Sequence, residues 1–256
     1  MTRIFSDFAY ESGRIDGCFW ANAVPEDALR CPDLQGDQQA HVGIIGAGFT
    51  GLNAALNLAN DNVSVAVLDA DYPGFGASGR NGGFCCLGGS KASSAFLSKV
   101  YGDTARRDYR MAEKRAVDYV ADLLKTHNII ADTHSNGETE LAHSPRAFAG
   151  FTASVDQIKD DYGLTATVLP KEALREHGMN GSFHGALTTP HGFSLDPRKY
   201  LLGLLNAART AGASVFGDSA VTRIERSANG YVLHTSNGRL RCKKLIIATN
   251  GYSSDD

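Results

Sequence analysis

The sequence predicts an α/β fold whose framework is a doubly wound parallel sheet. Three short apolar runs have the near-continuous hydrophobicity of strands buried on both faces, at 41–45, 63–68 and 245–248. Between the first two, apolar residues recur at the spacing of one helix face, at Leu52, Ala55, Leu56 and Ala59. Strand, helix and strand within about thirty residues form the unit that joins parallel strands. We therefore expect a sheet that contains 41–46, 63–69 and 245–248.

The remaining segments follow from local signals. Residues 1–40 are punctuated by Gly, Pro and Asp and predict an irregular N-terminal arm. The stretch 72–90 is so rich in glycine that no regular element is expected there. Helical periodicity returns over 109–123, and the charged residues of 103–125 are expected on the solvated face of that helix.

The C-terminal third carries clear helix and hairpin signals. Asp196-Pro197 predicts the start of a helix that runs to Arg209, because Asp suits the N-cap and Pro the first helical position. Asn229-Gly230 and Asn237-Gly238 each predict a type I′ hairpin turn between short β runs. Together these turns predict a three-stranded meander over 219–242, followed by the separate buried strand at 245–248.

Composition narrows the class of protein. Hydrophobic residues make up 43% and charged residues 21%, as in ordinary globular domains, and the formal charge of −3 argues against a nucleic-acid partner. No stretch predicts a membrane helix or a signal peptide, and the five cysteines show neither metal spacing nor a disulfide framework. We expect a cytoplasmic protein without a metal ion, a membrane or a nucleic acid as partner.

A glycine-rich turn between the first strand and helix predicts a dinucleotide site. The motif is Gly46-Ala47-Gly48-Phe49-Thr50-Gly51, and Asp69 ends the second strand. The glycines allow a tight turn, close approach of a pyrophosphate and close helix packing, while the helix N-terminus favours phosphate. Asp69 can bind ribose hydroxyls, and Ala70 leaves no arginine for a 2′-phosphate, which disfavours NADP.

A second glycine-rich segment follows the second predicted strand. It comprises Gly76, Ala77, Ser78, Gly79, Arg80, Asn81, Gly82 and Gly83. In a doubly wound sheet this segment lies at the carboxyl edge, where ligands bind. Its small residues would admit a flat ring or a diphosphate to the backbone, and Arg80 would add positive charge. A flexible connecting loop is the alternative interpretation.

The motifs GIIGAGFTGL, VLDA and GFGASGRNGGF together resemble FAD-dependent amine and amino-acid oxidoreductases of the D-amino-acid oxidase superfamily. The resemblance is to the gamma-glutamylputrescine oxidoreductase-like branch and runs from about residue 20 to the end. It implies a Rossmann-like FAD domain and oxidation of a C–N bond in a small amine or amino-acid substrate. The expected reaction is hydride transfer to flavin N5, with O2 as acceptor.

The resemblance also implies roles for particular residues. Gly46 to Gly51 would hold the FAD pyrophosphate, Asp69 the adenosine ribose, and Ala77 to Gly83 would run towards the flavin. Val221 would meet the adenine through its backbone. The strand-end turn beside the cofactor would contain Ala248, Thr249 and Gly251. No catalytic residue is assigned, because a neutral amine can lose hydride without a side-chain base.

Domain organisation follows from the same resemblance. We expect a cofactor-binding domain from 41–135 and 196–256, including the meander, and part of an inserted α+β substrate domain from 136–195. Members of this family are considerably longer, so the resemblance implies the N-terminal portion of such an enzyme, with an incomplete substrate domain. A buried strand at 245–248 that is followed by eight residues also predicts a truncated chain or a covering partner.

Two other functions remain open from the sequence. An NAD-dependent dehydrogenase would share the glycine fingerprint but has no evident use for 76–83. An inactive fragment that binds nucleotide would also carry the same motifs. Cys85 and Cys86 directly follow the glycine-rich segment, but without a paired base we interpret them as buried structural thiols.

Overall fold

The computed structural model describes residues 17–89 and 92–253, and the chain divides into two compact units. The first contains 17–82, 127–131 and 196–253, and the second contains 83–89, 92–126 and 132–195. This division differs from the expected one, which assigned 83–126 and 132–135 to the cofactor-binding part. The long helix that begins at Asp103 packs on helices of the second unit, and its sequence periodicity could not identify that partner.

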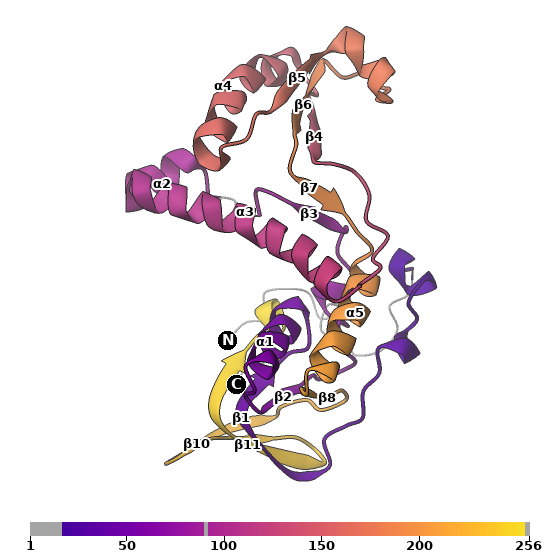
Figure 1. Ribbon diagram of the computed structural model, residues 1–256, viewed down its shortest axis with the longest axis vertical. Helices are drawn as coiled ribbons and strands as arrows, with labels where there is room; N and C mark the ends of the chain where they lie inside the picture. Colours follow the sequence, from indigo (N-terminus) through magenta and orange to yellow (C-terminus); the bar gives the residue numbers. More distant parts are fainter. Residues whose placement is uncertain (1–16, 90–91, 254–256) are drawn as a thin grey trace. The chain divides into compact units, whose positions relative to one another are not determined.

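The first unit is built on a six-stranded sheet of order β8-β2-β1-β11-β10-β9 (Figure 1). The strands are β1 (Gly36–Ile45), β2 (Val65–Leu68), β8 (Ser214–Phe216), β9 (Arg223–Ser227), β10 (Gly230–His234) and β11 (Gly238–Ile247). β1 pairs in parallel with both β2 and β11, β2 pairs in parallel with β8, and β9 and β10 are antiparallel. The predicted α/β class and the parallel pairing of the three apolar runs are confirmed.

Helices α1 (Phe49–Asn60) and α5 (Pro197–Thr210) pack together on one face of this sheet (Figure 1). Their inner faces are fully buried at Leu52, Leu56, Leu201 and Leu204. On alternate positions of β2, Ala66 and Leu68 belong to a separate buried cluster with Leu233 and Leu240 of the meander. All four residues of β2 are buried, so this strand is apolar on both faces, as expected for a central parallel strand.

The predicted end of the sheet was wrong in three respects. The third meander strand and the strand at 245–248 are one continuous strand, β11, which pairs with β10 at its start and with β1 along its length. Its last residues are not fully buried, and Ile247 is 60% exposed. Neither Asn229 nor Asn237 has a positive φ, so the hairpin turns are not type I′.

The start of α5 confirms the predicted cap. The Asp196 carboxylate accepts hydrogen bonds from the backbone N–H groups of Arg198 and Lys199, and Pro197 occupies the first helical position. The predicted end at Arg209 lies within one residue of the observed end at Thr210. The predicted irregular arm contains two 3₁₀ helices, η2 (Phe19–Asn22) and η3 (Glu26–Ala28), and its residues 1–16 lie outside the described ranges. The prediction was wrong for 36–40, because β1 begins at Gly36 and pairs with β11 over these residues.

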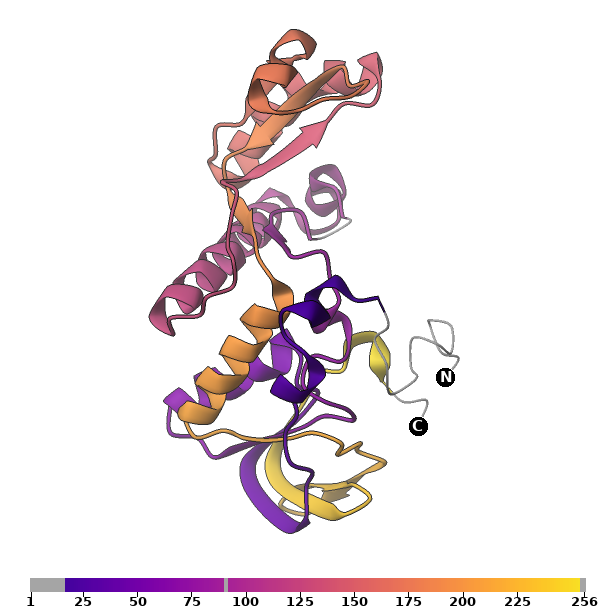
Figure 2. The same ribbon diagram turned by 90° about the vertical axis from the view of Figure 1, so that its right-hand side faces the viewer.

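The described part of the second unit contains three α-helices, one 3₁₀ helix and two small antiparallel sheets. The helices are α2 (Ser94–Tyr101), α3 (Asp103–Thr126), α4 (Pro145–Tyr162) and the 3₁₀ helix η5 (Lys171–His177). Its strands are β3 (Phe84–Cys86), β4 (Glu138–Leu141), β5 (Thr167–Pro170), β6 (Gly185–Thr189) and β7 (Gly192–Ser194). α4 packs on the β4-β6-β5 sheet (Figure 2), and β3 pairs with β7. Phe151 of α4 and Leu187 of β6 belong to one buried cluster.

The glycine-rich stretch 72–90 contains two short elements where none was expected. The 3₁₀ helix η4 (Ala77–Gly79) closes a turn in the first unit, and β3 begins at Phe84 in the second. Both are only three residues long, so they leave no periodic sequence signal. Within the described ranges, no helix combines the length and the apolar character needed to cross a membrane.

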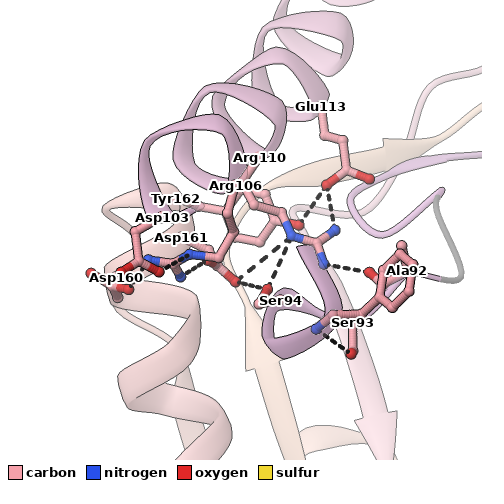
Figure 3. Close-up of polar contacts among 11 residues, drawn as sticks. Ala92, Ser93, Ser94, Asp103, Arg106, Arg110, Glu113, Asp160, Asp161 and Tyr162 are labelled. Carbon is pink, nitrogen blue, oxygen red and sulfur yellow. Dashed lines mark hydrogen bonds and ion pairs between the residues drawn. The ribbon is translucent and has the colours of Figure 1, made fainter. Parts of the chain in front are cut away.

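The charged face of α3 is partly buried, contrary to the expectation for 103–125. Arg106 and Arg110 are 5% and 6% exposed, and both point at Asp161 near the end of α4 (Figure 3). Arg110 also donates to Glu113 at 2.8 Å, whose carboxylate accepts from the Tyr162 hydroxyl at 2.9 Å. A buried ionic cluster therefore joins α3 to α4 in the second unit.

Candidate functional site

Four parallel strands of the first unit end at the same edge of the sheet. β1 leads into Gly46, β2 into Asp69, β8 into Gly217 and β11 into Ala248. The carboxyl edge of a parallel α/β sheet is where such folds bind ligands, because the loops there can diverge around a molecule. The structure therefore brings the first glycine motif, the acidic residue and the C-terminal turn to one place, as the sequence predicted.

The first glycine motif forms a turn in which side chains have no room. Gly46 has φ +103°, and a Cβ on Gly51 would lie 1.9 Å from the Gly46 carbonyl oxygen. A Cβ on Gly48 would lie 2.8 Å from Ser78 Oγ. Two of the three glycines thus allow backbone to approach backbone, while Gly48 leaves room for Ser78 of the second glycine-rich segment beside this turn.

The N-terminus of α1 faces that space. Gly48 is the N-cap and has no side chain to satisfy the first helical amides, which lack intrahelical partners. Ser78 Oγ accepts a hydrogen bond of 3.0 Å from the Phe49 amide, and Thr50 and Gly51 complete the first turn. The helix end carries partial positive charge, so this position favours an anionic group.

Asp69 connects the end of β2 to the glycine turn. Its carboxylate accepts hydrogen bonds from the Ala47 amide at 2.6 Å and from the Asp71 amide at 3.1 Å. Burial raises the pKa of Asp69 to about 6, and these two backbone hydrogen bonds oppose the rise. Ala70 follows as an exposed residue.

The second glycine-rich segment is divided between the units. Residues 76–82 belong to the first unit and Gly83, with φ +75°, to the second. Arg80 donates from Nε to the Gly76 carbonyl at 3.3 Å and from Nη2 to the Tyr252 hydroxyl at 3.1 Å. The Asn81 amide donates to the Ala77 and Ser78 carbonyls, which closes the turn on itself. The segment is thus held by specific bonds, unlike a flexible connector.

The C-terminal turn lies against the first glycine motif. The Ala248 amide donates to the Ile45 carbonyl at 2.8 Å, and a Cβ on Gly46 would lie 2.7 Å from the Ala248 carbonyl oxygen. Thr249 precedes the 3₁₀ helix η6 (Asn250–Tyr252), which contains Gly251. Val221 lies just before β9 and not in a strand, and it packs half-buried on the cluster that contains Leu68 and Leu233.

The structure adds three residues to this site that sequence reasoning missed. The Tyr252 ring lies beside Gly76, and its hydroxyl binds Arg80. Trp20 Nε1 donates to the Asn81 carbonyl at 2.8 Å, and the fully buried Arg198 packs beside Gly79. The single tryptophan is an unusual residue for an irregular arm, but no spacing rule connects these residues to a segment so distant in the chain.

Cys85 and Cys86 belong to β3 in the second unit, where they pair with Phe193 and Gly192 of β7. Burial raises the pKa of each thiol to about 11. A thiol with so high a pKa is protonated and unreactive at neutral pH. The raised pKa agrees with a structural role, but both cysteines are half-buried and not buried as expected.

Comparison with known proteins follows the same outline. Residues 41–256 match the family model described as FAD dependent oxidoreductase. The chain is 29% identical to the probable oxidoreductase OrdL of Rhizobium meliloti over 92% of its own length and 55% of the relative's. It is 31% identical to gamma-glutamylputrescine oxidoreductase of Escherichia coli over 83% of its length and 49% of the relative's. The chain thus spans about half the length of these relatives.

Solved structures share the fold, among them two that overlap with most of this chain. Glycine oxidase from Geobacillus kaustophilus superposes with a TM-score of 0.65 at 22% identity, over 82% of this chain and 55% of that one. L-amino acid deaminase from Proteus vulgaris superposes with a TM-score of 0.67 at 16% identity, over 86% of this chain and 50% of that one. With the family model matching most of its length, the chain belongs to the family of FAD-dependent oxidoreductases.

Proposed function

We propose that the first unit binds the ADP portion of FAD at the carboxyl edge of its sheet. The turn Gly46–Gly51 and the N-terminus of α1 would hold the pyrophosphate, and Asp69 the adenosine ribose. Ser78 and Arg80 would face the pyrophosphate from the second glycine-rich segment. Ala248, Thr249 and Gly251 would lie beside the cofactor, and Val221 would meet the adenine through its backbone.

The single observation that carries this proposal is the cradle around Gly48. A Cβ there would lie 2.8 Å from Ser78 Oγ, so the missing side chain lets Ser78 approach the N-terminus of α1 and accept from the Phe49 amide. That space offers helical amides and a hydroxyl, which suit phosphate oxygens. Asp69 lies at the end of the next strand, at the position from which an acidic residue binds ribose. The donors present therefore fit a dinucleotide.

For the whole protein we propose oxidation of a C–N bond in a small amine or amino acid. Family membership and the names of the relatives, gamma-glutamylputrescine oxidoreductase among them, support this substrate class. FAD, when bound, supplies the two-electron acceptor that converts the amine to an imine, which water hydrolyses, with O2 as the final acceptor. This chain's residues would bind the cofactor and orient it.

Part of the substrate-binding region is assigned by the same proposal to 136–195. These residues form the β4-β6-β5 sheet and α4 of the second unit. We assign no acid or base among them, because a neutral amine can lose hydride without a side-chain base. The second unit would then contribute surface and shape to the substrate rather than a proton-transfer group.

Thermal unfolding of the purified chain with FAD or NAD tests the cofactor assignment. FAD at a hundred times its Kd should stabilise the folded chain by about 2.7 kcal/mol, whereas NAD should leave Tm unchanged. Gly48 has φ −83°, so Gly48→Ala adds a methyl group to the cradle without backbone strain and should weaken FAD binding. Gly150→Ala, whose Cβ would meet no atom within 4 Å, is the matched control.

The outcomes separate the three possible functions. Stabilisation by NAD and not FAD would favour a dehydrogenase, and stabilisation by neither would contradict nucleotide binding. A flavin-loaded chain that forms no peroxide with any amine or amino acid, although FAD stabilises it, would favour a nucleotide-binding fragment. Equal FAD affinity in Gly48→Ala and wild type would argue against the cradle as the binding place.

A further inference from the structure

Arg198 is a fully buried cation in the first turn of α5. Arg198 is 1% exposed, and its Nη2 donates a hydrogen bond to the Tyr72 hydroxyl at 3.2 Å. The guanidinium carbon lies 5.5 Å from the centre of the Tyr72 ring. Its Nε is buried and has no hydrogen-bond partner among the described residues. The side chain is therefore only partly satisfied by its neighbours.

No carboxylate neutralises this guanidinium within the described ranges. No carboxylate oxygen of the described residues lies within 4.0 Å of a guanidinium nitrogen of Arg198. Asp196, two residues earlier, uses its carboxylate on the amides at the start of α5. The buried arginines of the second unit differ, since Arg106 and Arg110 both pair with Asp161. A buried charge without a counterion is costly, so Arg198 is unusual within its own chain.

Arg198 lies directly behind the turn that faces the proposed cofactor. Its Cγ would be 3.7 Å from a Cβ on Gly79, the last residue of η4. The hydroxyl of the preceding residue, Ser78, accepts a hydrogen bond from the Phe49 amide at the N-terminus of α1. Arg80 follows η4 and binds the Gly76 carbonyl and the Tyr252 hydroxyl, with no ion pair among the described residues. Two guanidinium groups and a positive helix end therefore surround one turn of three residues.

We propose that Arg198 is a positioning residue whose buried charge makes the η4 turn selective for a diphosphate group. It acts from behind the turn, through the field it adds to that of α1 and through its contact with Gly79, and does not touch the ligand. Low surrounding polarity strengthens this field because little water screens it. The inference rests on the proposed function, and it adds a residue that no glycine fingerprint contains.

A purely structural role for Arg198 makes a different prediction. If the side chain only supports Tyr72 and η4, its removal should weaken all ligands of the site to a similar degree. If its charge acts on the diphosphate, its removal should weaken ADP and leave adenosine nearly unchanged. The ratio of the two dissociation constants separates these roles, and the probes are ADP and adenosine themselves.

Calorimetric titration of the full chain with each probe provides the test. Arg198→Met should weaken ADP by about tenfold, because it removes one positive charge whose field little water screens. Arg198→Lys restores the charge and should recover most of the ADP preference. Lys199 is the neighbouring cation of the same helix and lines a separate cavity of about 940 Å³. Lys199→Met should therefore change neither the ADP nor the adenosine dissociation constant.

Each outcome decides the matter. A wild-type chain that binds neither ADP nor FAD refutes the proposed function itself, and with it this inference. If the wild type prefers ADP and Arg198→Met keeps the same preference, the inference alone is wrong. Should Arg198→Met fail to fold, Arg198→Gln replaces it, and failure of both to fold would assign the arginine to fold stability and overturn the proposal.

Discussion

The Asp69 carboxylate accepts a 2.6 Å hydrogen bond from the backbone amide of Ala47 and so links the end of β2 to the turn after β1. The backbone of Asp69 is also fixed, since its amide donates to the Phe216 carbonyl and its carbonyl accepts from Ser219. Hydrogen bonds of this one residue therefore connect the ends of β1, β2 and β8 at the candidate site. Its position is set by the fold before any ligand arrives, which is what a preorganised site requires.

The raised pKa of Asp69 predicts a specific pH dependence of stability. Its pKa of about 6 in the folded chain exceeds the value near 3.9 of an unfolded Asp, so the folded state binds more protons between these values. The stabilising contribution is fully present below about pH 4 and is lost as pH rises through 6. Asp69→Asn cannot titrate and should lack this component.

Urea unfolding of wild type and Asp69→Asn between pH 4 and 8 measures the effect. The free energy of unfolding of wild type relative to the variant should fall as pH rises to about 6.5 and then level off. Subtracting the variant removes the titration of other carboxyl groups, such as Asp37 and Asp160, whose pKa values are lowered by neighbouring arginines. A difference independent of pH would contradict the assignment of a raised pKa to Asp69.

Gly51→Ala should destabilise the first unit severely. The added Cβ would lie 1.9 Å from the Gly46 carbonyl oxygen, a backbone atom that cannot rotate away, so α1 must shift from β1. We expect a loss of about 2 kcal/mol or more in the free energy of unfolding.

The exposed glycine of α4 offers the opposite result. Gly150→Ala meets no atom within 4 Å and should stabilise by about 0.5–1 kcal/mol, because alanine is the better helix former. Chemical denaturation of both variants checks the pair. Equal stability of Gly51→Ala and wild type would show that the turn is looser than the structure indicates.

Local sequence signals were sufficient for two parts of the chain, the β1-α1-β2 unit apart from the start of β1 at Gly36, and α5. In both, glycine, aspartate or proline mark the ends of elements, and the apolar periodicity lies within one element. The same kind of signal was present for α4, where Ser144 caps the helix, Pro145 begins it and Gly163 ends it, but the charged interior obscured it. Element boundaries are recoverable where side chains act on their own backbone.

Long-range pairing explains what the sequence could not show. Arg106 can be buried because its guanidinium forms an ion pair with Asp161, 55 positions away. Helical periodicity contains no information about that partner. β11 alternates in burial where it pairs with β10 and becomes a continuous apolar run beyond it, so one strand resembled two. At the candidate site, the glycines and Asp69 were identified by spacing, whereas Ser78 reaches the α1 amide only through the tertiary fold.

The ionic cluster between α3 and α4 should contribute strongly to the second unit. Arg106→Met leaves the buried Asp161 carboxylate with Ser94 and Arg110 only, and we expect a loss of about 3 kcal/mol. Lys114→Met removes the exposed pair with Asp118 on the same helix and should cost less than about 0.5 kcal/mol.

Hydrogen exchange of the α3 and α4 amides measures the loss of stability within the second unit. Global unfolding alone would not locate the loss there. A double variant that replaces Arg106 and Asp161 by Met and Leu should recover part of the loss, because no charge then remains unpaired in that pair. Similar effects of Arg106→Met and Lys114→Met would show that the cluster is solvated.

The thiols of Cys85 and Cys86 should react slowly and with a distinctive pH profile. Burial raises their pKa to about 11, so only a small thiolate fraction exists at neutral pH, and the thiolate is the reactive form. The rate of alkylation by iodoacetamide should rise about tenfold per pH unit up to pH 9.5, whereas a thiol with pKa near 8.5 would level off. Mass spectrometry after timed labelling locates the modified residue. If either cysteine is labelled rapidly at pH 7.5 in the folded chain, it has an activated thiolate and its interpretation as a structural thiol is wrong. Unchanged FAD affinity in Cys85→Ser and Cys86→Ser would support that interpretation.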